Sequence, residues 1–184
     1  MEPIEQQKLT LAEFDALPDD GERRELLDGE ALMTPSPLAV HQRAAYQFAI
    51  RLQPACPEDL EVFIAPFDYR PDDRNSLQPD LLVCRGEDVE TAGVRRPLLL
   101  AVEILSPSTR AKDLLKKRRL YEEAGVGAYW IFEPEEAVLT VLELEGGRYL
   151  ERTFKDDEVF EAQHPFPVRI VPAELVRRAN RAAI

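Results

Sequence analysis

The sequence predicts an α+β fold, in which a mixed β-sheet is flanked by helices. Helical patterns come first in the 184-residue chain, and short apolar runs bounded by proline, glycine and charged residues fill its middle. That order of elements is typical of a mixed sheet with helices packed on it. The length and the lack of internal repeats predict a single domain over residues 1–184, with residues 1–8 as a flexible tail.

Capping and turn residues place the first elements. Thr10 and Glu13 have the spacing of a capping box, which predicts a short helix over LAEFDAL that ends at Pro18. Asp28-Gly29 lies between two apolar segments and predicts a two-residue hairpin turn. Ser36-Pro37 supplies an N-cap and a first-turn proline for a helix that we expect to reach about residue 53, before a proline.

The middle and the end of the chain follow the two-residue period of strands. Gly125 predicts the C-terminal end of a helix over about 111–124, and Pro172 can begin a last helix. The glycine pair after Glu145 predicts a hairpin turn. Strands are predicted over 60–70, 79–84, 97–105, 128–133, 137–145, 148–154 and 167–171.

Composition excludes several classes of protein. The chain has 23 Lys+Arg against 35 Asp+Glu and a formal net charge of −12, whereas proteins that coat nucleic acid carry a net basic surface. Its longest nearly apolar run, residues 97–105, is far shorter than the ~20 residues that span a bilayer. The first residues lack the pattern of a signal peptide, and two cysteines are too few for a disulfide framework. We therefore expect a cytoplasmic protein.

Two carboxylates occupy positions that disfavour charge. Glu103 interrupts the apolar run LLLAVEIL, where a carboxylate is buried unless it is paired or bound to a metal. Asp80 begins the strand DLLVC. If these two strands pair antiparallel, the start of one lies beside the end of the other, and the two carboxylates come close together. Oxygen ligands of this kind suit Mg²⁺, Mn²⁺ or Ca²⁺.

Lys117 and His41 are the other polar residues on apolar helix faces. On a helical wheel Lys117 falls in the same arc as Leu120 and Tyr121, together with Asp113. An inward ammonium near a carboxylate–metal pair can position a water or offset charge on a phosphate. His41 falls in the middle of the apolar stripe of the helix that follows Ser36.

Each of these signals also has a purely structural interpretation. Glu103 can be a buried acid paired with an arginine, and Asp80 can simply begin a strand or cap a turn. Lys117 can extend its ammonium to solvent or pair with Asp113 one turn earlier. His41 alone is typical of a hydrogen-bonded core histidine. Six of the ten residues from Arg110 to Arg119 are basic, and such a run is usually a solvated helix face.

Three segments resemble a known family. PDLLVC (79–84), VEILSPSTRAKDLLKKRRLY (102–121) and AGVGAYWIFEP (124–134) resemble the Uma-type predicted endonucleases of the PD-(D/E)XK, or restriction-endonuclease-like, superfamily. The upstream segment RRELLDGEALMTPSPLAVHQ (23–42) is similar to the amino-terminal signature of the same group. The similarity runs from about residue 9 to residue 170. It implies a restriction-endonuclease-like fold, with a central mixed sheet, and a divalent metal at the aspartate and glutamate.

The resemblance also assigns roles to residues. The superfamily pattern has a lysine two residues after the strand glutamate, and this chain has Leu105 there. In this branch a lysine of the following helix is thought to substitute, and Lys117 matches that place. Glu25 and His41 match the remaining polar positions of the signature and are expected to border the site, as is Asp113.

The function predicted from these residues is a metal-dependent endonuclease that hydrolyses phosphodiester bonds of nucleic acid, with DNA as the expected substrate. Asp80 and Glu103 would bind Mg²⁺ or Mn²⁺ with the Ile104 carbonyl as an extra ligand, and Lys117 would complete the catalytic set. Cleavage of a duplex needs two cuts, which favours a homodimer. The candidate phosphate contacts are Arg110, Lys112, Lys116 and Arg119.

Two alternatives remain open at this stage. A catalytically silent protein of the same fold could serve binding or assembly, and the net charge of −12 together with Leu105 favours it. A metal hydrolase acting on a small phosphate ester would keep the site without nucleic acid. A weak salt dependence of substrate affinity would point to this hydrolase, because the binding of DNA releases counterions and is strongly salt-dependent.

Overall fold

The computed structural model describes residues 8–34, 36–105 and 113–177, and at residues 113 and 114 it describes only the backbone. The proposed tail (residues 1–7 of it), Arg110, Lys112 and the Asp113 side chain therefore lie outside the described part. The helices are α1 (Leu11–Asp15), α2 (Ala39–Ala55), η1 (Gly86–Asp88), η2 (Asp113–Lys117), α4 (Arg118–Glu123) and α5 (Pro172–Val176). None of the helices in these ranges is long and apolar enough to cross a membrane.

Two six-stranded sheets and a two-stranded one account for the strands of the described residues. The central sheet has the order β12-β11-β10-β9-β6-β3, formed by Arg148–Lys155, Val138–Glu145, Ala128–Glu133, Leu100–Ile104, Leu81–Arg85 and Leu60–Ile64. Strands β9 and β10 run parallel, and the other neighbours are antiparallel, so the sheet is mixed as predicted.

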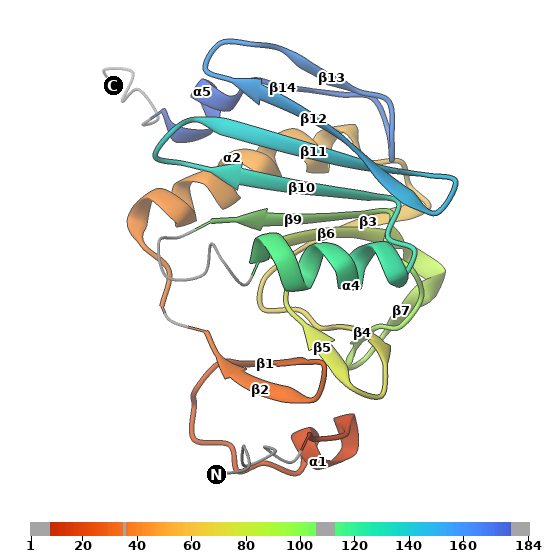
Figure 1. Cartoon of the computed structure of the whole chain (residues 1–184). Helices are drawn as coiled ribbons and strands as arrows, with labels where there is room; N and C mark the ends of the chain where they lie inside the picture. Colours follow the sequence, from red (N-terminus) through yellow and green to blue (C-terminus); the bar gives the residue numbers. More distant parts are fainter. Residues whose placement is uncertain (1–7, 35, 106–112, 178–184) are drawn as a thin grey trace, which may run out of the picture.

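The second sheet, β2-β1-β5-β4-β8-β7, packs below the first (Figure 1). Its strands are Glu30–Met33, Arg24–Leu27, Asn75–Leu77, Tyr69–Asp72, Gly93–Val94 and Val89–Glu90. Strands β13 (Phe160–Ala162) and β14 (Val168–Ile170) pair separately. The sequence did not predict β5, β7, β8 or β13, because these strands of two or three residues do not stand out from their surroundings as apolar runs.

The two faces of the central sheet are covered differently, and α2 and α4 lie on opposite sides of it (Figure 1). On one face Val83, Val102 and Trp130 belong to a buried cluster with Phe48 and Leu52 of α2. The other face forms a second cluster with Tyr121 of α4 and with the second sheet. The core thus has two layers, and the Glu103 side chain discussed below lies on the α4 side.

Several predicted boundaries are confirmed. Thr10 forms the capping box with Glu13, and Pro172 begins the last helix. Asp28 and Gly29 adopt the positive φ angles that a two-residue hairpin turn requires, and Gly125 has a φ of 74° just after α4. The glycine pair 146–147 joins β11 to β12.

Other boundaries were wrong. The predicted strand 60–70 is two strands in two sheets, because Pro66 lacks the N–H that would continue the ladder. Helix α2 begins at Ala39 rather than Pro37, since Leu38 is still extended. Leu38 is exposed, and the helix ends one residue after Pro54 rather than before it.

Candidate active site

The site lies where β6 begins and β9 ends. The strands pair antiparallel, which is the condition on which the expected proximity of the two carboxylates rested. Leu81 lies opposite Val102, so one step further brings Asp80 beside Glu103. Glu103 points to the face of the sheet that packs against α4, where it contacts Lys117 and Tyr121, whereas the Asp80 carboxylate lies just before β6 and contacts His41 of α2. Asp80 is 8% exposed and Glu103 is 5% exposed. Two acids in one nearly dry place require compensating donors or cations.

Hydrogen bonds hold Asp80 in place. Its Oδ2 accepts the main-chain N–H of Ile104 at 2.7 Å, across the gap between the two strands. Nε2 of His41, on the first turn of α2, lies 3.1 Å from the same oxygen. The main chain of Asp80 is fixed as well, since its carbonyl accepts the N–H of Ala65. The position of this carboxylate is therefore set by β9, α2 and the turn after β3.

Lys117 reaches the carboxylates from the opposite side. Its Nζ lies 2.9 Å from Oε1 of Glu103 and 3.0 Å from Oε1 of Glu25. The lysine is 5% exposed, so the sequence-based prediction that it points inward is confirmed. It ends the π-helical turn η2, just before α4. Such turns are frequent at functional sites in proteins.

Glu25 belongs to the second sheet and links it to the site. It lies on β1, is 7% exposed and accepts the main-chain N–H of Gln78 at 2.7 Å on the same oxygen that contacts Lys117. Gln78 comes two residues before Asp80. The prediction that Glu25 and His41 border the site agrees with where the structure puts them, and their roles stay predictions.

Sequence reasoning missed Tyr121. Its hydroxyl donates to Oε1 of Glu103 at 2.9 Å. Burial raises the pKa of Tyr121 well above its usual range, and the nearby Glu103 carboxylate raises it further, so the hydroxyl stays protonated. The available signal was its spacing of four residues from Lys117, which puts both on one helix face. The helical wheel counted the tyrosine as apolar and overlooked its hydroxyl.

Carboxylates outnumber ammonium groups among the buried side chains that the structure describes at the site. Three carboxylates, from Glu25, Asp80 and Glu103, and the Lys117 ammonium are buried there. Nδ1 of His41 is buried and has no hydrogen-bond partner among the described residues. A divalent cation between the carboxylates would neutralise this excess.

The donor set suits a hard cation. No group of three or more His, Cys, Asp or Glu side chains arranged to hold a metal occurs in the described ranges. Mg²⁺ usually keeps several waters and uses only one or two carboxylates, so two acids and a main-chain carbonyl are sufficient for it. Asp80, Glu103 and Ile104 therefore fit Mg²⁺ or Mn²⁺ by their chemistry.

The position of the superfamily lysine is apolar here. Leu105 is 7% exposed and packs in the cluster that contains Leu120 and Tyr121. The ammonium that contacts Glu103 comes instead from Lys117, fourteen residues along the chain. A lysine ammonium therefore contacts Glu103 although the usual strand position of the lysine is occupied by Leu105.

The expected phosphate contacts that the structure describes are already paired with acids. Lys116 and Arg119 are exposed, as predicted. However, Nζ of Lys116 lies 3.0 Å from Oε2 of Glu30, and Nη2 of Arg119 lies 2.8 Å from Oδ2 of Asp28. Both acids come from the β1–β2 hairpin. The hairpin thus contacts the helix through Lys116, Lys117 and Arg119.

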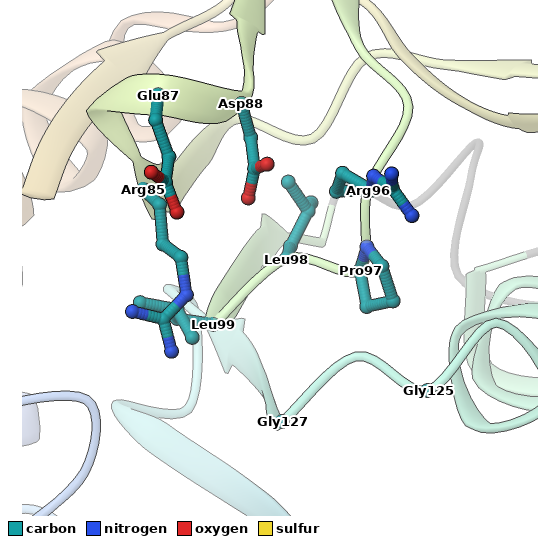
Figure 2. A pocket seen from close by; sticks show the side chains of 9 residues that line it. All are labelled: Arg85, Glu87, Asp88, Arg96, Pro97, Leu98, Leu99, Gly125 and Gly127. Carbon is teal, nitrogen blue, oxygen red and sulfur yellow. The ribbon is translucent and has the colours of Figure 1, made fainter.

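Two pockets lie at the other end of the central sheet. One of about 510 Å³ lies between Arg85 and Arg96, with Leu98 and Leu99 against it (Figure 2). A second, of about 600 Å³, shares Arg85 and includes His164. Arg85 ends β6, whereas Asp80 precedes its first residue. Neither pocket therefore contains the buried carboxylates.

Comparison with known proteins agrees with this picture. The family model described as "Uma2: Putative restriction endonuclease" matches residues 11–174. A solved structure, titled as a "putative nuclease belonging to DUF820" from Anabaena variabilis, has the same fold with a TM-score of 0.70. It is 18% identical in sequence, and the alignment covers 91% of this chain and 97% of that one. A search of the curated proteins finds no match. Since the family match covers most of its length, the chain belongs to the Uma2 family.

Proposed function

We propose that the protein is a metal-dependent endonuclease that hydrolyses phosphodiester bonds in DNA. The observation that carries the proposal is the contact of Lys117 with Glu103, next to Asp80, inside a family described as restriction endonucleases. A structural ion pair would need only one acid for one lysine, whereas the Lys117 ammonium contacts two buried acids, Glu103 and Glu25, and a third, Asp80, lies beside Glu103. Such a cluster of buried carboxylates is typical of sites that hold a cation.

Asp80 and Glu103, with the Ile104 carbonyl, would hold Mg²⁺ or Mn²⁺. A metal bound there would lower the pKa of a coordinated water and neutralise charge on the scissile phosphate. The Ile104 N–H and His41 keep Asp80 in one orientation, which preserves the ligand geometry when substrate arrives. Glu25 shares Lys117 with Glu103 and so keeps the ammonium in the site.

Lys117 would act on the reacting groups. Its ammonium can orient the attacking water or stabilise the extra negative charge that develops on the phosphate in the transition state. Because it is 5% exposed, its charge is only weakly screened by solvent. These are the tasks that a strand lysine performs in the superfamily pattern, moved here to a helix.

Nucleic acid would approach along the basic helix. Lys116 and Arg119, with Arg110 and Lys112 from the neighbouring segment, would contact phosphates without reading bases. Since both described cations pair with hairpin acids, substrate phosphates must compete with Glu30 and Asp28. A homodimer would supply the two cuts that a duplex requires.

A silent binding protein of the same fold is the competing proposal. It is favoured by Leu105 in the core and by the ion pairs that occupy Lys116 and Arg119. In that case Lys117 would only balance the buried carboxylates. Under this alternative, neither the addition of metal nor the replacement of a site carboxylate changes the binding or assembly activity of the protein.

Plasmid cleavage separates the two proposals. Supercoiled DNA is incubated with wild type, Asp80→Asn and Glu103→Gln in Mg²⁺ or Mn²⁺, with Glu161→Gln of the exposed part of β13 as the matched control. The proposal predicts nicking that EDTA stops, that the control retains and that both site variants lose by at least a hundredfold. Cleavage that survives both site variants contradicts the proposed site. A folded wild type that cleaves neither DNA nor RNA supports the silent alternative.

A further inference from the structure

Two donors of the described part of the chain contact the same carboxylate oxygen of Glu103. The Tyr121 hydroxyl and the Lys117 ammonium both lie 2.9 Å from Oε1. The two donors are four residues apart, so they project from the same side of the helical segment. A carboxylate held by two donors on one oxygen has little freedom to rotate about its side-chain bonds. Its orientation is fixed before any ligand binds.

The tyrosine ring is itself rigid. Tyr121 is fully buried, and its ring stacks near Tyr69 with a centroid distance of 6.2 Å and packs against Tyr129 at 4.8 Å. Close packing in this buried aromatic cluster restricts movement of the ring. The hydroxyl is therefore a fixed donor, whereas the Lys117 ammonium lies at the end of a flexible chain and is shared with Glu25.

We propose that Tyr121 is the positioning residue that orients the Glu103 carboxylate toward the divalent cation. The inference rests on the proposed metal-dependent function. Groups that hydrogen-bond a metal ligand set its orientation and basicity, and their loss typically weakens metal binding about 10–100-fold. The Lys117 ammonium cannot orient Glu103 alone, because it also contacts Glu25.

The same cluster supplies a matched control. The Tyr149 hydroxyl is buried and donates to the main-chain carbonyl of Val126 at 2.9 Å, with no contact to the site carboxylates. Tyr121→Phe and Tyr149→Phe each remove one buried hydrogen bond and leave the ring in place. The two variants should therefore lose similar thermal stability, and only one of them touches Glu103.

Calorimetric titration with Mn²⁺ tests the inference on wild type and both variants, with near-UV circular dichroism to verify the fold. We expect Tyr121→Phe to bind Mn²⁺ about tenfold or more weakly and Tyr149→Phe to stay within about twofold of wild type. Equal binding by wild type and Tyr121→Phe overturns the inference alone, and so does equal weakening in both variants. Wild type that binds no Mn²⁺ overturns the proposed metal site and this inference with it.

Discussion

Lys117 and Glu103 are fourteen residues apart in the sequence, and the lysine ammonium donates to a carboxylate oxygen of the glutamate at 2.9 Å. The pair connects the helical turn η2 to the central strand β9. Because Glu25 contacts the same ammonium, the two sheets and the helix meet at one buried cation. This contact gives the chain a lysine at the site although the strand position that usually carries it is Leu105.

Removal of the Lys117 charge should destabilise the fold. Lys117→Met removes the ammonium that contacts the buried Glu25 and Glu103, and breaking a buried pair in this way costs about 3–5 kcal/mol. Adding Glu25→Gln and Glu103→Gln should restore part of the loss. Urea denaturation measures each free energy of unfolding. Lys116→Met, at the exposed neighbour, serves as control; equal midpoints for Lys116→Met and Lys117→Met would rule out a strong buried pair.

Removal of the hairpin acids that pair with Lys116 and Arg119 should strengthen binding to nucleic acid. In the Asp28→Asn, Glu30→Gln double variant, Lys116 and Arg119 lose their hairpin partners, and Arg119 keeps only its longer pair with Glu123 at 3.7 Å among the described residues. The net charge also becomes less negative, so affinity for a duplex should rise several-fold at low salt. Fluorescence anisotropy at two salt concentrations checks this. Glu143→Gln with Glu161→Gln changes the net charge equally on other strands. If that control gains as much affinity, the effect is one of overall charge, and the helix is not the binding surface.

The Glu122 carboxylate should stabilise the folded protein at neutral pH and lose this effect in acid. It accepts the Tyr149 N–H at 2.6 Å and pairs with Arg148, and these contacts lower its pKa below the usual 4.5. A carboxyl with a lowered pKa in the folded state stabilises above its unfolded pKa, and this contribution is lost as the pH falls through the folded value. The unfolding temperature of Glu122→Gln should therefore change less with pH than that of wild type. The range to measure is pH 3 to pH 7, roughly where carboxyl groups titrate. Parallel pH profiles for variant and wild type would contradict the assignment.

Tyr69→Phe should stabilise the protein. The Tyr69 hydroxyl is buried without a hydrogen-bond partner in the described part of the chain, and burial raises its pKa. An unsatisfied buried polar group costs about 1–3 kcal/mol, so its removal should raise the unfolding temperature. Tyr149→Phe, which loses a hydrogen bond to Val126, should lower it. A lower unfolding temperature for Tyr69→Phe would show that the hydroxyl has a partner in solution.

Local patterns in the sequence were sufficient to predict the two strands that carry the site, while their antiparallel pairing was only a condition of the prediction. Apolar runs predicted β6 and β9, and antiparallel pairing brought Asp80 beside Glu103. The helical period predicted an inward Lys117, because a charge inside an apolar arc is visible without knowledge of its partner. The turns at Asp28-Gly29 and at Gly125 followed from the conformational freedom of glycine.

Contacts between distant segments could not be predicted in the same way. The pairing of Lys116 with Glu30 depends on how the hairpin packs on the helix, and the periodicity of apolar residues in either segment does not predict that packing. Short strands such as β5 have no period at all. Tyr121 was missed because burial and hydrogen bonding are separate properties of one side chain, and a hydropathy pattern reports only the first.

The location of bound metal tests the central claim most directly. Crystals grown with Mn²⁺ allow the ion to be found by its anomalous scattering, independently of any activity. We expect one peak in direct coordination with Asp80 and Glu103, beside the Lys117 ammonium, and no such peak in Asp80→Asn crystals. A well-ordered wild-type site without a peak, or a peak held only by other residues, would contradict the proposed metal-dependent nuclease.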